Sequence, residues 1–302
     1  MDWQGPFTGN GWLGTVVYFC DPPPNGHGRG GFCQIGNATG KAEMRIELGR
    51  QDLYSARVPH ANYWNGVRLP VGYLRLPLAG TLRSGLLRLN LYTAELTGHL
   101  VTSVGRVEVR LATLATSNMH LLEINGTGGE AHDAATPAVS PFVFVPLTRC
   151  VDRWDVQGLI NCTMHPYPAA TCEAESSGEY VCHQSLNAAE GSFATAVLQQ
   201  TDAVGGGRKV YMTTESNLWP FDTATDPRPV ALAAVRQAAT AGCYALLAPH
   251  REWWREYWGQ TFFSFTNTDD DMRTESFYNV ELYRLGSSMR EDGPVRDEIG
   301  PW

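Results

Sequence analysis

Apolar and polar side chains alternate with a period of two along much of the first part of the chain. Met44, Ile46 and Leu48 alternate with polar or small residues, and the same alternation recurs through residues 86–111. Successive side chains of a strand point to opposite faces, so this pattern predicts strands with one face in a core and one in water. Short glycine-containing turns separate them, which leaves no room for crossover helices. We therefore predict an antiparallel meander over residues 86–111, as part of a β-sandwich.

Beyond residue 225 the apolar period lengthens to between three and four residues, which is typical of amphipathic helices. The first apolar stripe consists of Leu232, Val235, Ala239, Cys243 and Leu246. Pro249 predicts the end of this helix because proline lacks the backbone N–H that a helix interior uses, and a second helix is expected from His250. A further helical run spans about Met272 to Arg290. The fold class is therefore mainly β with a C-terminal α part.

The second helix is unusually aromatic, with three tryptophans and a tyrosine among residues 253–258. Such dense aromatic packing needs a large partner surface, and little sequence follows that could supply one. We therefore expect the chain to be the front part of something longer. Trp253, Trp254 and Trp258 are expected to form a packed joint while staying partly exposed.

Composition and charge exclude several classes of function. The hydrophobic content of 43% and charged content of 18% describe a globular protein. A formal net charge of −8 argues against nucleic-acid binding, which relies on Lys and Arg. No apolar run approaches the ~18 residues of a membrane span, and the N-terminus lacks a secretory signal pattern. We expect neither a nucleic-acid nor a membrane partner, and the oligomeric state stays open.

Four cysteines recur every ten to twelve residues in a region that reads as loops: Cys150, Cys162, Cys172 and Cys182. This spacing is typical of disulfide-stapled loops and too wide for a zinc site, whereas unpaired cysteines in a cytosolic protein are the alternative. Three glycosylation triplets begin at Asn37, Asn125 and Asn161. Localisation is left open between these readings, with a lean towards an extracellular protein.

Common catalytic and cofactor motifs find no support. Gly26, Gly28 and Gly31 satisfy G-x-G-x-x-G, but no helix follows to hold a pyrophosphate. Residues 269–271 are three aspartates, which we interpret as acids at a helix start rather than metal ligands. Neither a G-x-S-x-G elbow nor an H-E-x-x-H motif occurs. We expect no cofactor and no metal.

Two separated groups of motifs resemble one enzyme family. Residues 9–17, GNGWLGTVV, resemble the "GNGxLGAMV" signature near the start of glycoside hydrolase family 95 and its relatives. Residues 69–74 (LPVGYL) and 89–95 (LNLYTAE) are similar to the strands that follow it there. The chain is more similar to an uncharacterised branch of these six-hairpin glycosidase-like proteins than to the fucosidases of the family.

The second group lies near the C-terminus. His250, Trp253-Trp254, Trp258 and residues 275–285 resemble the linker and first barrel helix of the family. Residues 300–302, Gly-Pro-Trp, are similar to the segment that opens the barrel cleft. The resemblance covers most of the chain in order, except for residues 128–220.

The resemblance implies an N-terminal antiparallel β-supersandwich over residues 1–225. It also implies that residues 226–302 form a helical linker and the first helix of an incomplete (α/α)₆ barrel. Family members hydrolyse O-glycosidic bonds by inversion, with an acid and a base on barrel loops beyond the point where this chain ends. Inversion needs two carboxylates about 6.5–9.5 Å apart. The chain is therefore expected to lack most of the catalytic barrel.

We nominate no catalytic residue in this chain. The carboxylates considered are Glu275, Glu281, Asp297, Glu298 and those of residues 269–271. Glu281 and Arg284 stand three residues apart on a helix and are expected to pair with each other.

The candidate substrate-binding residues are aromatic side chains with polar neighbours. Sugar rings present apolar C–H faces that stack on indole, while their hydroxyls need amide or imidazole partners. Trp12 with Asn10, Trp64 with His60, and Trp302 are the residues that we expect to contact a carbohydrate substrate. Core packing of these tryptophans is the alternative.

Two classes of function remain open. The first is the N-terminal portion of a glycoside hydrolase that acts on a polysaccharide or glycan. The alternative is a non-catalytic carbohydrate-binding β-sandwich, or an inactive gene fragment.

Overall fold

The structure is a computed structural model that describes most of the two sheets and the three helices. The described residues are 5–20, 43–55, 67–131, 139, 142–144, 148–150, 164–176, 178–186, 191–201, 207–218, 225–261, 264, 269–291 and 293.

An eight-stranded antiparallel sheet forms the centre of the fold. Its strands are β7 (Leu82–Asn90), β8 (Glu95–Thr102), β9 (Gly105–Thr113), β10 (His120–Gly128), β14 (Thr171–Ser176), β15 (Glu179–Ser185), β16 (Ser192–Thr201) and β17 (Arg208–Ser216). They lie in the order β14-β15-β16-β17-β10-β9-β8-β7. Strands β7 to β10 are neighbours in chain order, which confirms the predicted meander.

A five-stranded antiparallel sheet packs against one face of the larger sheet. Its strands are β1 (Phe7–Gly9), β2 (Leu13–Cys20), β3 (Glu43–Arg50), β6 (Gly72–Pro77) and β11 (Val143–Phe144), in the order β1-β2-β3-β6-β11. Two short pairs complete the described strands: β4 (Tyr54–Ser55) with β5 (Val67–Arg68), and β12 (Thr148–Cys150) with β13 (Met164–Pro166).

The main core lies between these two sheets. Ile46 and Leu74 of the smaller sheet pack with Val109, Leu122 and other inward side chains of the larger one, and all of them are buried. The alternation read from the sequence places these residues on the inner faces, as the burial pattern of β3 shows. The β-sandwich prediction is therefore confirmed.

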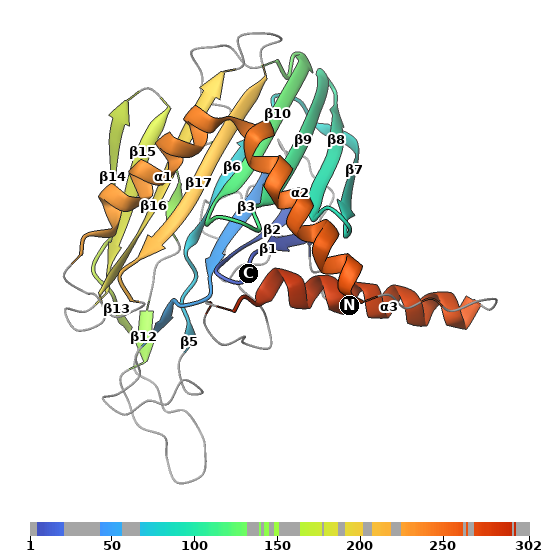
Figure 1. The fold of residues 1–302 in the computed structure, drawn as a ribbon. Coiled ribbons are helices and arrows are strands. Elements are labelled where there is room, and N and C mark those ends of the chain that lie inside the picture. Colours follow the sequence, from blue (N-terminus) through green and yellow to red (C-terminus); the bar gives the residue numbers. More distant parts are fainter. Residues whose placement is uncertain are drawn as a thin grey trace.

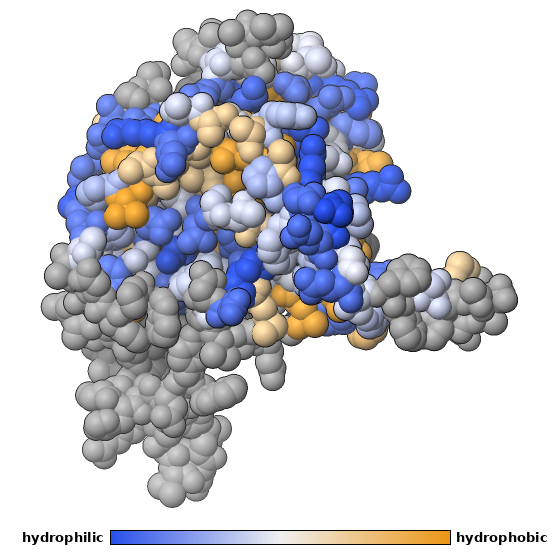
Figure 2. All heavy atoms as spheres, viewed as in Figure 1, coloured by the Kyte–Doolittle hydropathy of each residue, from blue (hydrophilic) through white to orange (hydrophobic). Residues whose placement is uncertain are grey.

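Three helices follow the sheets: α1 (Pro227–Ala241), α2 (Cys243–Gln260) and α3 (Asp269–Ser288). Helices α1 and α2 lie across the outer face of the larger sheet (Figure 1), where Val235 and Leu247 pack against Leu121 and Tyr211. Figure 2 shows hydrophobic residues gathered over α1 and its junction with α2, with hydrophilic residues around them. The predicted fold class, mainly β with C-terminal α, is confirmed.

The boundary between the first two helices differs from the prediction. They meet at Gly242 with a bend of 97°, and Pro249 lies inside α2 instead of ending the first helix. Gly242 has φ +81° and ψ 154°, a conformation that glycine adopts without steric cost. The bend lets both helices follow the sheet, and this packing overrides the local preference of Pro249.

Helix α3 projects beyond the sandwich at its N-terminal end, while its C-terminal end lies beside β1 (Figure 1). Met272, Phe277 and Val280 are exposed on the projecting part, whereas Tyr283 and Ser287 are buried. Among the described residues no single helix is long and apolar enough to cross a membrane, and α1 with α2 passes that test only as a bent pair.

Candidate functional site

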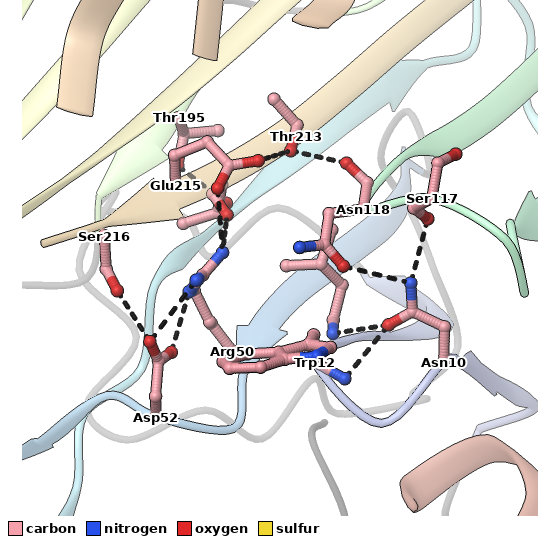
Figure 3. A network of polar contacts seen from close by, with 12 residues as sticks. Asn10, Trp12, Arg50, Asp52, Ser117, Asn118, Thr195, Thr213, Glu215 and Ser216 are labelled. Carbon is pink, nitrogen blue, oxygen red and sulfur yellow. Dashed lines mark hydrogen bonds and ion pairs between the residues drawn. The ribbon is translucent and has the colours of Figure 1, made fainter. Parts of the chain in front are cut away.

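Asn10 lies in the turn between β1 and β2 and fastens that turn to the turn between β9 and β10. Its Oδ1 accepts hydrogen bonds from the backbone N–H groups of Trp12 (3.0 Å) and Leu13 (2.8 Å). Its Nδ2 donates to the carbonyl oxygens of Leu114 and Ser117, both at 2.9 Å. These bonds use the whole amide, which is 3% exposed. Asn10 therefore sets the position of Trp12 (Figure 3).

Trp12 is half-buried, and a guanidinium covers part of its indole ring. The Cζ atom of Arg50, at the end of β3, lies 5.6 Å from the ring centroid. A guanidinium at this distance is attracted to the aromatic face and holds the ring in one orientation. Trp12 is thus a fixed, partly accessible aromatic surface at one end of the sandwich (Figure 3).

Arg50 ties the two sheets together through carboxylates on both sides. Its side chain is 4% exposed, and Nε donates to Asp52 Oδ1 at 2.7 Å. Nη1 donates to the carbonyl oxygen of Thr214 and lies 3.4 Å from Glu215 Oε2, both on β17. Ser216 donates its hydroxyl to Asp52 Oδ2 at 2.6 Å. Buried charges need such partners, and here each charge has one.

Glu215 is the carboxylate of this group whose pKa shifts. Burial raises its pKa, and the nearby Arg50 guanidinium counteracts part of that effect. The Thr213 hydroxyl lies 3.1 Å from Glu215 Oε1 and 2.6 Å from the carbonyl oxygen of Asn118. We call Asn10, Trp12, Arg50, Asp52 and Glu215 the Trp12 cluster. Because Arg50 joins the two carboxylates, this cluster fits binding and positioning better than proton transfer.

The aromatic residues of α2 form a joint between the sandwich and α3. Trp254 is fully buried and stacks on Tyr283 with ring centroids 5.3 Å apart. A Cβ on Gly286 would lie 2.9 Å from the Trp254 ring, so α3 approaches this closely only with glycine there. Trp258 donates from Nε1 to the carbonyl oxygen of Leu91 at 3.0 Å. The predicted packed joint is present.

The expectation that all three tryptophans stay partly exposed is wrong for Trp254 and holds for Trp253 and Trp258, which are half-buried. The reason is that α3 folds back over α2 and covers the Trp254 ring.

The C-terminal end of α3 reaches the turn that contains Trp12. The backbone N–H of Gly11 donates to the carbonyl oxygen of Ser287 at 2.9 Å. Gly11 has φ +85°, and a Cβ there would meet Arg290 and Met289 at 3.0 Å or less. Tyr283 also donates to the carbonyl oxygen of Phe7 at 2.7 Å. The glycine-rich turn of residues 9–14 is therefore the docking surface for α3.

Helix α2 is fastened to the meander by buried polar contacts. His250 is fully buried, its Nδ1 accepts from the N–H of Ala115 at 3.0 Å, and its Nε2 lies 2.8 Å from the carbonyl oxygen of Thr93. The ring is thus neutral with the proton on Nε2, and burial lowers its pKa to about 4. Arg251 donates to both oxygens of buried Glu95, at 2.6 and 2.8 Å.

The structure describes only part of the predicted site. Asn10 and Trp12 are brought together, but His60, Trp64 and Trp302 lie outside the described residues, as do Asp297, Glu298 and the glycine motif of residues 26–31. Glu281 and Arg284 pair at 3.7 Å, as predicted. The three aspartates of residues 269–271 begin α3, where acids at a helix start were expected.

Sequence reasoning missed Arg50, Asp52 and Glu215. A buried-strand pattern that ends in Arg-x-Asp was the available signal for the first two. Nothing local to Glu215 connects it to residues that lie more than 160 positions earlier.

Metal and disulfide chemistry were also addressed by the sequence. Within the described part of the chain, no group of three or more His, Cys, Asp or Glu side chains could hold a metal ion. Cys172 and Cys182 form a disulfide across β14 and β15. The side chains of Cys150 and Cys162 lie outside the described residues, so their pairing stays a prediction.

Comparison with known proteins gives one distant structural likeness. No family model matches the chain, and no curated protein matches it either. The chain is similar in structure to a proposed kojibiose phosphorylase from the human microbiome, with a TM-score of 0.44 and 8% sequence identity. The likeness covers 83% of this chain and 32% of that one, so the chain spans about a third of the phosphorylase. A likeness at this level carries no argument about activity or substrate.

Proposed function

We propose that this chain is the N-terminal β-sandwich and helical linker of an enzyme that acts on glycosidic bonds. Residues 1–225 form the sandwich domain in this proposal, and residues 226–302 begin a helical barrel similar to that of glycoside hydrolase family 95. The acid and base are supplied by the remainder of that barrel. The finer assignments, including hydrolysis with inversion and a glycan substrate, rest on the resemblance.

The observation that carries the proposal is the contact between the two sequence segments that resemble the family. The turn of residues 9–14 receives the end of α3 through the Gly11–Ser287 hydrogen bond of 2.9 Å. The second segment also anchors to the sandwich through His250 and Trp258. Two segments that resemble one family at opposite ends of the chain thus form a single interface.

The projecting part of α3 fits the same proposal. Met272, Phe277 and Val280 are 57%, 69% and 43% exposed. Exposed apolar side chains along one helix favour burial against another element. In the proposed enzyme, the next helices of the barrel cover them.

Trp12 is the sugar-contacting residue of this proposal. Its ring is held by Asn10 and Arg50, so a sugar that stacks on it meets a surface that needs little ordering. His60, Trp64 and Trp302 remain proposed partners for the sugar hydroxyls and C–H faces.

The test is to sequence the full transcript and express the protein both as residues 1–302 and as the complete open reading frame. We expect the frame to continue into further amphipathic helices, and the complete product to cleave glycosidic bonds in a panel of oligosaccharides. Residues 1–302 alone should show no turnover. A stop codon directly after Trp302, together with a stable product of 302 residues, would contradict the proposal.

A carbohydrate-binding sandwich without catalysis is the second candidate function. It is favoured by the Trp12 cluster itself, whose carboxylates are joined by Arg50 and whose aromatic ring lies on the sandwich. Affinity electrophoresis of residues 1–302 in gels that contain soluble polysaccharides tests it. Retention that is lost in Trp12→Ala and kept in Trp253→Phe would support binding at Trp12, whereas retention equal in both variants would exclude it.

A further inference from the structure

A groove separates the edge hairpin β14–β15 from the first turns of α1, on a part of the molecule that the proposed function does not use. Its volume is about 330 Å³. Glu173, Glu175 and Val181 line it from the hairpin, and Arg228, Leu232 and Arg236 are among the residues that line it from the helix. The floor is apolar because Val181 and Leu232 are buried there, while both rims are charged.

The arginines of the rim already have close carboxylate partners. Arg228 donates to both oxygens of Asp226 at 2.8–3.1 Å. Arg236 donates to Glu179 from Nε at 2.7 Å and from Nη2 at 3.2 Å. Each guanidinium is therefore largely neutralised by a residue of the protein itself.

Glu173 and Glu175 are left without such close partners. Their nearest recorded cations are Arg228 Nη1 at 3.6 Å and Arg236 Nη2 at 3.8 Å, both beyond hydrogen-bonding distance. The two glutamates stand two positions apart on β14, so their side chains point to the same face of the strand. They are 60% and 36% exposed and can accept hydrogen bonds from a ligand.

The groove carries a net negative charge. Four carboxylates, those of Glu173, Glu175, Glu179 and Asp226, face two guanidiniums, which leaves a net charge of −2. Burial and the nearby Arg228 lower the pKa of His183, so this imidazole adds no positive charge at neutral pH.

The floor of the groove is held covalently. The disulfide between Cys172 and Cys182 joins β14 to β15 directly beside Glu173. The edge strand therefore presents its carboxylates at a fixed spacing, which lowers the ordering cost of binding.

We propose that this groove binds a small organic ammonium ion, with the ammonium group between Glu173 and Glu175 and the aliphatic or sugar body on Val181 and Leu232. The groove lined by two free carboxylates and an apolar floor selects a cation that also carries apolar C–H groups. Linear polyamines and amino sugars share this chemistry. The site is independent of the Trp12 cluster and of the proposed glycosidic activity.

The experiment is isothermal titration calorimetry on the 302-residue protein with spermidine and with glucosamine, in low salt and at physiological salt. N-acetylglucosamine is the matched neutral probe, because acetylation removes the charge of glucosamine and keeps its ring. We expect binding of spermidine, glucosamine or both, weakened by salt because the partners are partly exposed. N-acetylglucosamine should bind at least about tenfold more weakly than glucosamine if the amino sugar binds.

Variants separate binding in the groove from general attraction to an acidic protein. Glu173→Gln with Glu175→Gln should weaken amine binding by at least about tenfold. Arg228→Gln should strengthen it, because Asp226 then becomes a third available carboxylate. Glu108→Gln, on the distant β9 and paired with Arg106, removes the same charge elsewhere and should change nothing.

Circular dichroism melting curves establish that each variant is folded before titration. Equal affinity of the wild-type protein and the Glu173/Glu175 double variant would overturn the proposal. So would a loss of affinity in Glu108→Gln equal to that of the double variant, or the absence of amine binding in low salt.

Discussion

At the scale of single residues, the buried polar side chains act as fasteners between elements. His250 connects α2 to the loops at both ends of the meander, and its contacts define which nitrogen carries the proton. Arg50 connects β3 to β17 in the same way. Each of these side chains is buried by tertiary packing, and burial shifts the protonation equilibria of its group or of its partner.

His250 predicts acid sensitivity. The pKa of this imidazole is 6.5 without the fold and about 4 within it, so the unfolded chain takes up the proton first as the pH falls. Stability should therefore decline between pH 6.5 and pH 4, by about 3 kcal/mol in total from this group. Urea unfolding across this range measures it. His250→Gln should be less stable at pH 7 and show a flatter pH dependence, whereas His99→Gln on β8 should follow the wild type.

The partners of Arg50 predict opposite effects at neutral pH. Asp52→Asn removes the closest partner of a buried guanidinium and should destabilise the fold by about 2–3 kcal/mol. Burial raises the pKa of Glu215, so the charged form of Glu215 opposes folding, and its contribution to stability is lost as the pH rises. Glu215→Gln should therefore melt at or above the wild-type temperature at pH 7 and lose that advantage in acid. A large destabilisation by Glu215→Gln at pH 7 would contradict this account.

At the scale of elements, the bend between α1 and α2 shows packing overriding local preference. A proline inside a helix removes one hydrogen bond and crowds the preceding turn, yet α2 continues through Pro249. Its flanking residues Leu247 and His250 are both buried against the sheet, which holds the helix through this position. The chain changes direction at Gly242, where the positive φ is available.

Two substitutions test this description of the bend. Pro249→Ala should raise the melting temperature, because it restores a helical hydrogen bond at an exposed position, with a gain of about 1 kcal/mol or more. Gly242→Ala should cost about 1–2 kcal/mol through its positive φ alone, since a Cβ there meets nothing within 4 Å. Thermal melts of both variants provide the measurement. A destabilised Pro249→Ala would mean that the proline is required for the course of α2.

At the scale of the whole molecule, the body is a packed sandwich with one helix that extends past it. The two sheets share one core, and α1 and α2 cover the outer face of the larger sheet. Helix α3 is held only at its C-terminal end, by Gly11, Trp254 and Phe7. A helix segment with few tertiary contacts is marginally stable in water.

Limited proteolysis tests this uneven support of α3. Trypsin should cleave residues 1–302 early after Arg273, which is exposed in the projecting part, and late after Arg284, which lies beside the buried Tyr283. Mass spectrometry of the first fragments distinguishes the two sites on one helix. Equal protection of both bonds would show that the projecting turns are covered in solution, for example by a second copy of the chain.

The sequence alone determined the elements that depend on local periodicity. Alternation of period two identified the strands of the meander, and the change of period identified the helices, because both patterns reflect how a regular backbone divides its side chains between core and water. The same reasoning placed Asn10 beside Trp12, since they are two positions apart.

Only the tertiary structure decided which distant residues meet. The order of the sheets brings Arg50 to Glu215, the fold-back of α3 buries Trp254, and the surface under α1 and α2 moves their junction from Pro249 to Gly242. None of these contacts leaves a periodic trace in the chain. Their energies come from pairs that are close only after the strands have assembled, which is why periodicity predicts the elements and not the site between them.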